Sequence, residues 1–333
     1  MINHKFCVAP MMDWTDRHDR VFLRQFSRHA LLYTEMITSA ALIHGDANYL
    51  LHHDPSEQPV AIQLGGSEPD DLAQAAELAA AAGYCEINLN VGCPSERVKS
   101  GAFGACLMAD PPLVARCVSA MRRAVSIPVT VKCRTGIDDR DSEQELADFV
   151  AQVAEAGCDV FIIHARKALL DGLSPKQNRE IPELNYGRVF KIKALFPALE
   201  IVLNGGISTL DSAEELFSKV DGIMLGRAAY QNPYLLHEVD SRIFGDVQSS
   251  KSRLDYLNQY LVYIENELQR GTPLHHMTRH ILGLFKGQAG GKQFRRHLSE
   301  NSHRKDASLN LVLDAMAYVS QAHPNNNMVK QEK

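Results

Sequence analysis

The chain has 333 residues, a formal net charge of −5 at pH 7 and an apolar fraction of 45%, which is ordinary for a globular protein. It contains no run of about 18 apolar residues and no basic-then-apolar leader, so the sequence predicts neither a membrane span nor a secretory signal. Its seven cysteines are scattered without CxxC pairs, which argues against a disulfide framework and against a zinc site. We therefore expect a cytoplasmic protein with reduced thiols and no metal.

Short apolar or β-branched runs alternate with helical patterns through most of the chain. The runs predict eight strands, at Lys5–Ala9, Leu31–Thr34, Val60–Leu64, Glu86–Leu89, Val129–Lys132, Val160–His164, Ile201–Asn204 and Gly222–Leu225. Helical spacing predicts helices over Asp70–Ala82, Leu113–Ala124, Glu143–Ala156 and Ser212–Ser218, with Ser142 and Thr209 placed as N-caps. Eight such units, with no GxGxxG after the first strand, favour a (β/α)8 TIM barrel over a doubly wound sheet.

The sequence changes in character after the last predicted strand. The stretches "LDYLNQYLVYIENELQR", "MTRHILGLFKG" and "LNLVLDAMAYV" carry apolar residues at helical spacing. We therefore expect a barrel domain over residues 1–240, a C-terminal helical domain over residues 241–322, and a disordered polar tail over residues 323–333.

Polar residues stand where several predicted strands end. Because barrel enzymes carry their active site at the carboxyl ends of the strands, we expect these side chains to meet at one mouth. The most informative ends are "NGGI" at 204–207 and "GR" at 226–227, where glycines let backbone N–H groups approach an anion and Arg227 adds a positive charge. They predict a phosphate site, although glycines can also simply make tight turns.

Three further strand ends fit a flavin. Lys132 could neutralise the reduced ring, Gln63 could hydrogen-bond its pyrimidine edge, and His164 could contact phosphate or substrate. Each residue alone could be a satisfied structural polar group, so the inference rests on their coincidence at one mouth.

Cys93 lies in the turn "NVGCP", just past the fourth predicted strand. A thiol with an ordinary pKa near 8.5 is mostly protonated at pH 7 and can act as a general acid. The alternative is a thiol that packs as a small hydrophobe, which we expect for Cys106 and for the five cysteines that lie on predicted strands and helices.

Basic residues are concentrated near the C-terminal end of the chain. Between residues 270 and 305 only Glu300 opposes Arg270, Arg279, Lys286, Lys292, Arg295, Arg296, Arg304 and Lys305. Such a run can be a solvated helix face, but its excess of one sign favours contact with a nucleic acid backbone. Lys176 and Arg179 in "SPKQNRE" add basic charge after the sixth strand.

Six stretches of the sequence form a specific set. They are "APMMDWTD" at 9–16, "NLNVGCP" at 88–94, "VKCRTGID" at 131–138, "HARKALLDGLSPKQNREIPELNY" at 164–186, "NGGI" at 204–207 and "LGRAAYQNP" at 225–233. Together they resemble the tRNA-dihydrouridine synthases, in particular the bacterial A-type subfamily. Related flavin barrels share the phosphate loops but not the "NxGCP" turn together with "SPKQNR".

This resemblance implies a site and a reaction. FMN would be bound by Pro10, Met11, Met12, Gln63, Lys132, His164, Asn204, Gly205, Gly206, Gly226 and Arg227, and NADPH would reduce it. Hydride would pass from the flavin to C6 of a D-loop uracil at position 20 or 20a, while Cys93 protonates C5. The tRNA would be held by Asn90, Arg97, Lys176, Arg179, Tyr186, Arg295 and Arg296, and we expect the protein to act as a monomer.

Two other functions remain open from the sequence. One is a flavin dehydrogenase for a free small pyrimidine, of the dihydroorotate or dihydropyrimidine type, with Cys93 as base; the basic C-terminal segment argues against it. The other is a non-catalytic RNA-binding barrel, which a purified protein that stays colourless with FMN would favour.

Overall fold

The computed structural model describes residues 2–95 and 103–320. The chain forms two compact units: Met1–Arg17 with His29–Gly226, and His18–Arg28 with Arg227–Lys333. The predicted tRNA contact Arg97 and the predicted tail at 323–333 lie outside the described residues. Among the helices that are described, none is long and apolar enough to cross a membrane.

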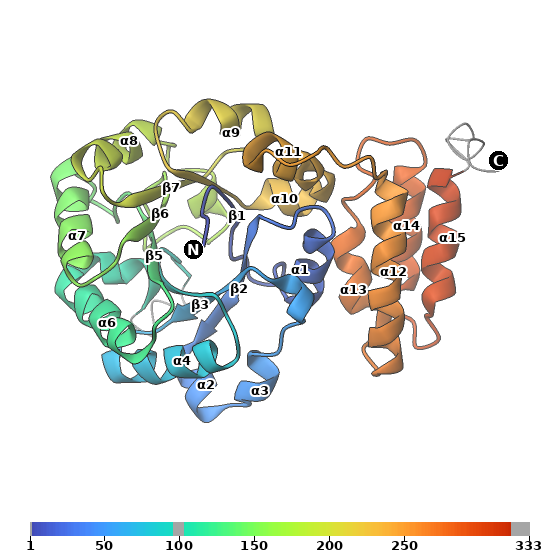
Figure 1. Cartoon of the computed structure of the whole chain (residues 1–333), viewed down its shortest axis with the longest axis horizontal. Coiled ribbons are helices and arrows are strands. Elements are labelled where there is room, and N and C mark those ends of the chain that lie inside the picture. The colour runs from blue at the N-terminus through green and yellow to red at the C-terminus, as the bar shows by residue number, and fades with distance from the viewer. Residues whose placement is uncertain (1, 96–102, 321–333) are drawn as a thin grey trace. The chain divides into compact units, whose positions relative to one another are not determined.

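The first unit is a closed barrel of eight parallel strands in sequence order, which confirms the predicted TIM barrel (Figure 1). β1 pairs with both β2 and β8, so the sheet closes on itself. The strands are β1 (Phe6–Val8), β2 (Leu31–Thr38), β3 (Val60–Gly65), β4 (Glu86–Val91), β5 (Val129–Arg134), β6 (Val160–His164), β7 (Glu200–Asn204) and β8 (Gly222–Leu225).

Helices surround this ring of strands (Figure 1). They are α2 (Ser39–His44), α3 (Ala47–Leu50), α4 (Pro69–Ala81), α6 (Pro111–Ala124), α7 (Glu143–Glu155), α8 (Tyr186–Leu195) and α9 (Leu210–Leu216), with 3-10 turns η1 (Pro55–Glu57), η2 (Gly104–Ala109) and η3 (Gln177–Arg179). The two predicted N-caps are confirmed. Ser142 forms a capping box with Glu145, and the Thr209 side chain accepts a hydrogen bond from the Ser212 amide.

The second unit is helical. It contains most of α1 (Arg17–Arg24), together with α10 (Arg227–Gln231), η4 (Pro233–Glu238), α11 (Val239–Phe244), α12 (Arg253–Gln269), α13 (Leu274–Ile281), α14 (Gly291–Asn301) and α15 (Leu309–Ser320). Phe22 on α1 lies 4.9 Å from the Tyr260 ring of α12, and Phe26 lies 4.4 Å from Tyr256. Aromatic packing of this kind explains why residues 18–28 group with the C-terminal helices.

Strand alternation decides what fills the barrel. Successive side chains point to opposite faces of a strand, so residues two apart share a face. The apolar middle of the interior contains Tyr33, Ala61, Ile162, Val202 and Met224, with neighbours of the same cluster. The predicted site residues two positions further along β3, β6 and β7 therefore lie on the same inward face: Gln63, His164 and Asn204.

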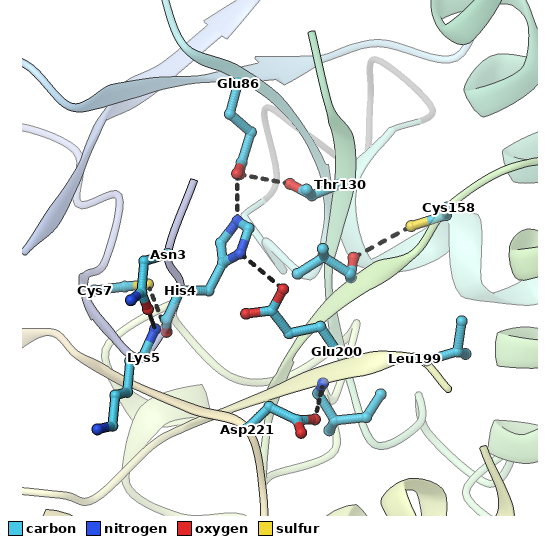
Figure 2. A network of polar contacts seen from close by, with 12 residues as sticks. Asn3, His4, Lys5, Cys7, Glu86, Thr130, Cys158, Leu199, Glu200 and Asp221 are labelled. Carbon is cyan, nitrogen blue, oxygen red and sulfur yellow. Dashed lines mark hydrogen bonds and ion pairs between the residues drawn. The ribbon is translucent and has the colours of Figure 1, made fainter. Parts of the chain in front are cut away.

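A buried charged cluster occupies the opposite end of the interior, near the strand N-termini (Figure 2). His4 Nε2 lies 2.5 Å from Glu86 Oε2, and His4 Nδ1 lies 3.1 Å from Glu200 Oε2. Tyr33 and Thr130 each donate a hydrogen bond of 2.7 Å to Glu86 Oε1. Burial opposes a charge on His4, but hydrogen bonds to Glu200 and Glu86 outweigh it and raise the pKa to about 10.

This cluster should make stability depend on alkaline pH. Folding raises the His4 pKa from 6.5 to about 10, so the stabilisation is complete below pH 6.5 and is lost as pH rises through 10. At about 1.4 kcal/mol per pKa unit, the rise from 6.5 to about 10 corresponds to a loss of about 5 kcal/mol. Urea unfolding of wild type and His4→Asn between pH 6 and 10 measures it. Parallel pH profiles for the two proteins would contradict the assignment.

Candidate active site at the barrel mouth

Polar side chains from neighbouring strands meet at the carboxyl ends of β3 to β7. Asn90 Nδ2 donates a hydrogen bond of 2.7 Å to Gln63 Oε1. Lys132 Nζ donates one of 3.0 Å to Asn204 Oδ1, and Asn204 Nδ2 in turn donates to the Met224 carbonyl at 2.8 Å. The structure thus brings the predicted strand-end residues together at one mouth.

The mouth is electropositive. Lys132 keeps partial solvent exposure, yet its amine lies among protein atoms, and this loss of hydration together with nearby Arg134 lowers its pKa to about 8. Burial, and then the positive charges of Arg134 and Lys132, hold the pKa of His164 well below 6.5. His164 is therefore a neutral imidazole at pH 7, and the site has the charge balance that suits an anionic ligand.

The Cys93 turn is fixed by the side chain that precedes it. Asn90 Oδ1 accepts hydrogen bonds from the Gly92 amide at 3.1 Å and from the Cys93 amide at 3.0 Å. The Cys93 carbonyl accepts from the Ala105 amide at 2.9 Å, and its Sγ lies 3.6 Å from Ser95 Oγ. The thiol is partly exposed, so a group held at the mouth can reach it.

Cys106, the second thiol of this region, has a different setting. It is also partly exposed, and its Sγ donates to the Phe103 carbonyl at 3.0 Å. Four other cysteines, Cys7, Cys117, Cys133 and Cys158, are buried. Cys93 differs from these five cysteines because it lies on the turn that directly follows β4.

The loop after β7 requires its two glycines. Gly205 and Gly206 have φ of +114° and +73°, a region that other residues adopt only with strain. A Cβ on Gly205 would lie 2.5 Å from His164 Cδ2, and one on Gly206 would lie 2.4 Å from Leu184 Cδ1. Tyr186 closes this loop by donating a hydrogen bond of 2.6 Å to the Gly205 carbonyl.

The remaining residues predicted to bind a cofactor divide between the units. Met11 Sδ would lie 3.5 Å from a Cβ on Gly226, and Met12, two residues after Pro10, is 55% exposed. Arg227 follows Gly226 directly but is the first residue of α10 in the second unit.

Two buried or half-buried arginines were not predicted from the sequence. Arg134 Nε donates to the Gly92 carbonyl at 3.1 Å, and its Nη1 donates to the Asn178 carbonyl at 2.8 Å. Arg166 lowers the pKa of His164, as Arg134 does. Arg134 lies two residues after Lys132, and Arg166 lies two residues after His164. Because residues two apart on a strand share a face, this spacing could have indicated both arginines from the sequence.

Of the residues predicted to bind tRNA that the structure describes, Asn90 is buried and Tyr186 is half-buried, whereas the four basic residues are exposed. Lys176 and Arg179 lie on the surface of the barrel unit, as the N-cap and the last residue of η3, whose buried Asn178 donates to the Leu169 carbonyl at 2.8 Å. In the helical unit, Arg295 and Arg296 are exposed on α14, on the side opposite buried Phe294 and Leu298. Arg296 also pairs with Glu300 at 2.8 Å.

Comparison with solved structures gives the fold alone. A 2-naphthoyl-CoA reductase in complex with 2-naphthoyl-CoA matches with a TM-score of 0.53 and 10% sequence identity, over 73% of this chain and 51% of the other.

Sequence comparison is more specific. Relatives called tRNA-dihydrouridine(20/20a) synthase are 56% identical in Vibrio cholerae (95% of this chain, 96% of the relative), 56% identical in Escherichia coli K12 (95% and 92%) and 59% identical in Pseudomonas putida (91% and 90%). The model of the family described as dihydrouridine synthase (Dus) matches residues 7–321, which include both the strands of the barrel and the helices that follow it. The chain therefore belongs to the dihydrouridine synthase family.

Proposed function

We propose that this protein is an FMN-dependent tRNA-dihydrouridine synthase that reduces the C5–C6 bond of D-loop uridines 20 and 20a with NADPH. One observation carries the proposal: relatives that bear this activity in their names are 56% identical over 95% of the chain. The mouth described above supports it, because a thiol, an electropositive strand end and a glycine loop lie together there.

FMN is proposed to bind at this mouth, where it supplies the hydride that adds to C6 of the uracil. The residues fit such a group on two counts. Gly205 and Gly206 adopt backbone conformations that other residues adopt only with strain, and glycine loops of this kind let backbone N–H groups approach a phosphate. Lys132 is a cation whose amine hydrogen-bonds a neutral amide, and it can neutralise negative charge on a reduced ring.

Cys93 is proposed as the general acid. When C6 of the uracil gains a hydride, C5 becomes the basic carbon, and the Cys93 thiol supplies the proton that completes the saturated bond. Solvent then returns a proton to the thiolate, which is accessible because Cys93 is partly exposed. Asn90, which fixes the turn, is proposed to orient the base after it leaves its stack, at a cost of a few kcal/mol.

The tRNA is proposed to contact exposed basic residues in both units. Lys292, Arg295 and Arg296 are spaced three and four residues apart on α14, so they share one exposed face. Lys176 and Arg179 are proposed to act from the barrel unit. Phosphate contacts of this kind give affinity that falls steeply with salt.

Cys93→Ala should lower the rate of dihydrouridine formation by roughly 10²- to 10⁴-fold, the usual contribution of a general acid. The measurement is single-turnover reduction of unmodified tRNA, read by mass spectrometry of the digested RNA. Cys106→Ala is the matched control and should keep its rate. Equal rates for Cys93→Ala and wild type would remove Cys93 from the reaction.

Cells that lack this protein provide the test of the proposed substrate. Their tRNA should lose dihydrouridine at positions 20 and 20a and regain it with wild type but not with Cys93→Ala. Intact dihydrouridine at both positions, or turnover of a free pyrimidine instead, would reject the proposal.

Lys132→Met should weaken FMN binding about 10- to 100-fold, the range for one hydrogen bond to a charged group. Titration by quenching of FMN fluorescence measures it. Because the pKa of Lys132 is about 8, wild-type affinity should also fall above that pH, while the variant should show no such fall. Lys167→Met, which removes a cation that pairs with Asp141 at 3.2 Å, is the control. Equal affinities for the two variants would contradict the assigned role.

Arg295→Gln should reduce the slope of log K against log salt for tRNA binding by about 1, the value for one phosphate contact. Fluorescence anisotropy with labelled tRNA at several salt concentrations measures the slope. Arg242→Gln makes the same charge change in the same unit, at an arginine that already pairs with Glu238 at 3.0 Å, and should leave the slope unchanged. Identical slopes for both variants would show that α14 does not contact the RNA.

A further inference from the structure

A continuous line of hydrogen bonds runs through the barrel interior from the buried charged cluster to the Cys93 turn. Thr130 Oγ1 donates to Glu86 Oε1 at 2.7 Å, and Asn88 Nδ2 donates to Thr130 Oγ1 at 2.8 Å. Gln63 Nε2 donates to Asn88 Oδ1 at 2.8 Å, and Asn90 Nδ2 donates to Gln63 Oε1 at 2.7 Å. Asn90 Oδ1 then accepts the amides of Gly92 and Cys93. The line therefore joins one end of the barrel to the other.

The line exists because three residues of β4 share a face. Glu86, Asn88 and Asn90 are two positions apart, so all three point into the barrel. β3 and β5 flank β4, with Asn88 opposite Gln63 on one side and opposite Thr130 on the other. Each inward side chain of β4 consequently reaches a partner on a neighbouring strand.

The charged end of the line determines the direction of every bond in it. Glu86 Oε1 accepts hydrogen bonds from Tyr33 and Thr130, and Oε2 pairs with His4, so both carboxyl oxygens serve as acceptors. Thr130 must then use its one proton on Glu86 and accept from Asn88. The Asn88 and Gln63 amides are oriented in turn, and Asn90 is left with its oxygen toward the turn. Reversal of the Asn90 amide would set its NH2 group against two N–H donors.

Burial makes this order costly to break. Glu86, Asn88 and Thr130 are 0% exposed, Gln63 is 2% exposed and Asn90 is 9% exposed. A polar group that loses its partner at such a position has little water to replace it. The acceptor role of Glu86 thus fixes the donor and acceptor direction of each following hydrogen bond as far as Asn90.

We propose that Glu86 and Thr130 are positioning residues, which fix the orientation of the Asn90 amide and through it the backbone of the Cys93 turn. They touch neither cofactor nor base, and they act through Asn88, Gln63 and Asn90. The effect on catalysis rests on the proposed role of Cys93, whereas the effect on the turn itself does not.

Two substitutions separate this role from general stability. Thr130→Val and Tyr33→Phe each remove one buried hydroxyl that donates 2.7 Å to the same Glu86 oxygen. Only Thr130 lies on the line to Asn90; Tyr33 is a side branch. Thr130→Ser keeps the hydroxyl and should restore the wild-type behaviour.

Hydrogen exchange of the Gly92 and Cys93 amides, followed by mass spectrometry or NMR, reads the turn directly. Thr130→Val should accelerate exchange at these amides about 3- to 10-fold, the equivalent of one net hydrogen bond. Tyr33→Phe and Thr130→Ser should leave it unchanged. Thr130→Ala removes the same hydroxyl and replaces Thr130→Val if that variant does not fold.

The activity measurement completes the test. Thr130→Val should lower kcat for tRNA reduction severalfold with KM for tRNA unchanged, and Tyr33→Phe should keep both. Equal exchange rates at Gly92 and Cys93 in Thr130→Val and Tyr33→Phe would overturn the proposal. Altered exchange without a change in kcat would support the positioning of the turn and count against Cys93 as the acid.

Discussion

The site depends on strand parity within a closed barrel. Because a strand presents alternate residues to the interior, a single inward face decides which side chains can meet. On β3, β6 and β7 this face is apolar in the middle and polar at the carboxyl end. On β4 and β5 it is polar throughout, with Glu86, Asn88 and Asn90 beside Thr130 and Lys132. A shift of one residue in either strand would remove the site and place charges among the helices.

Electrostatics makes the two ends of the interior different from each other. At one end His4 lies between two carboxylates and holds a proton tightly. At the other end burial, and then the positive charges of neighbouring basic residues, lower the pKa values of Lys132 and His164, and His164 is neutral. An anionic ligand would offset the repulsion between these positive charges, and this makes the free energy of its binding more favourable.

Much of the barrel could be predicted from the sequence, because strand and helix periods are local. The strands Val160–His164 and Gly222–Leu225 agree with the prediction, while β2, β4 and β5 extend further than their apolar runs. The extra residues include polar or charged ones, such as Thr38 on β2, Asn90 on β4 and Arg134 on β5, and each of these three pairs with a residue of a neighbouring strand. The apolar pattern of a segment does not predict this pairing, so the prediction ended these strands too early.

The residues that could not be predicted from the sequence are those whose partners are distant along the chain. His4, Glu86 and Glu200 stand on three separate segments, and only closure of the barrel brings them together. Arg134 likewise donates hydrogen bonds to a carbonyl of the Cys93 turn and to the Asn178 carbonyl of η3. No short motif marks these contacts, whereas the glycine loop and the "NVGCP" turn are visible because each is one continuous stretch.

The grouping of α1 with the C-terminal helices bears on how the chain matures during synthesis. Tyr260 donates a hydrogen bond to the His18 carbonyl across 242 positions of sequence, and Phe22 and Phe26 find their aromatic partners on the same distant helix. When α1 leaves the ribosome, that helix has not been translated. The aromatic residues of this segment therefore stay without their native partners until nearly the whole barrel has been translated, and transient contacts or chaperones must cover them meanwhile.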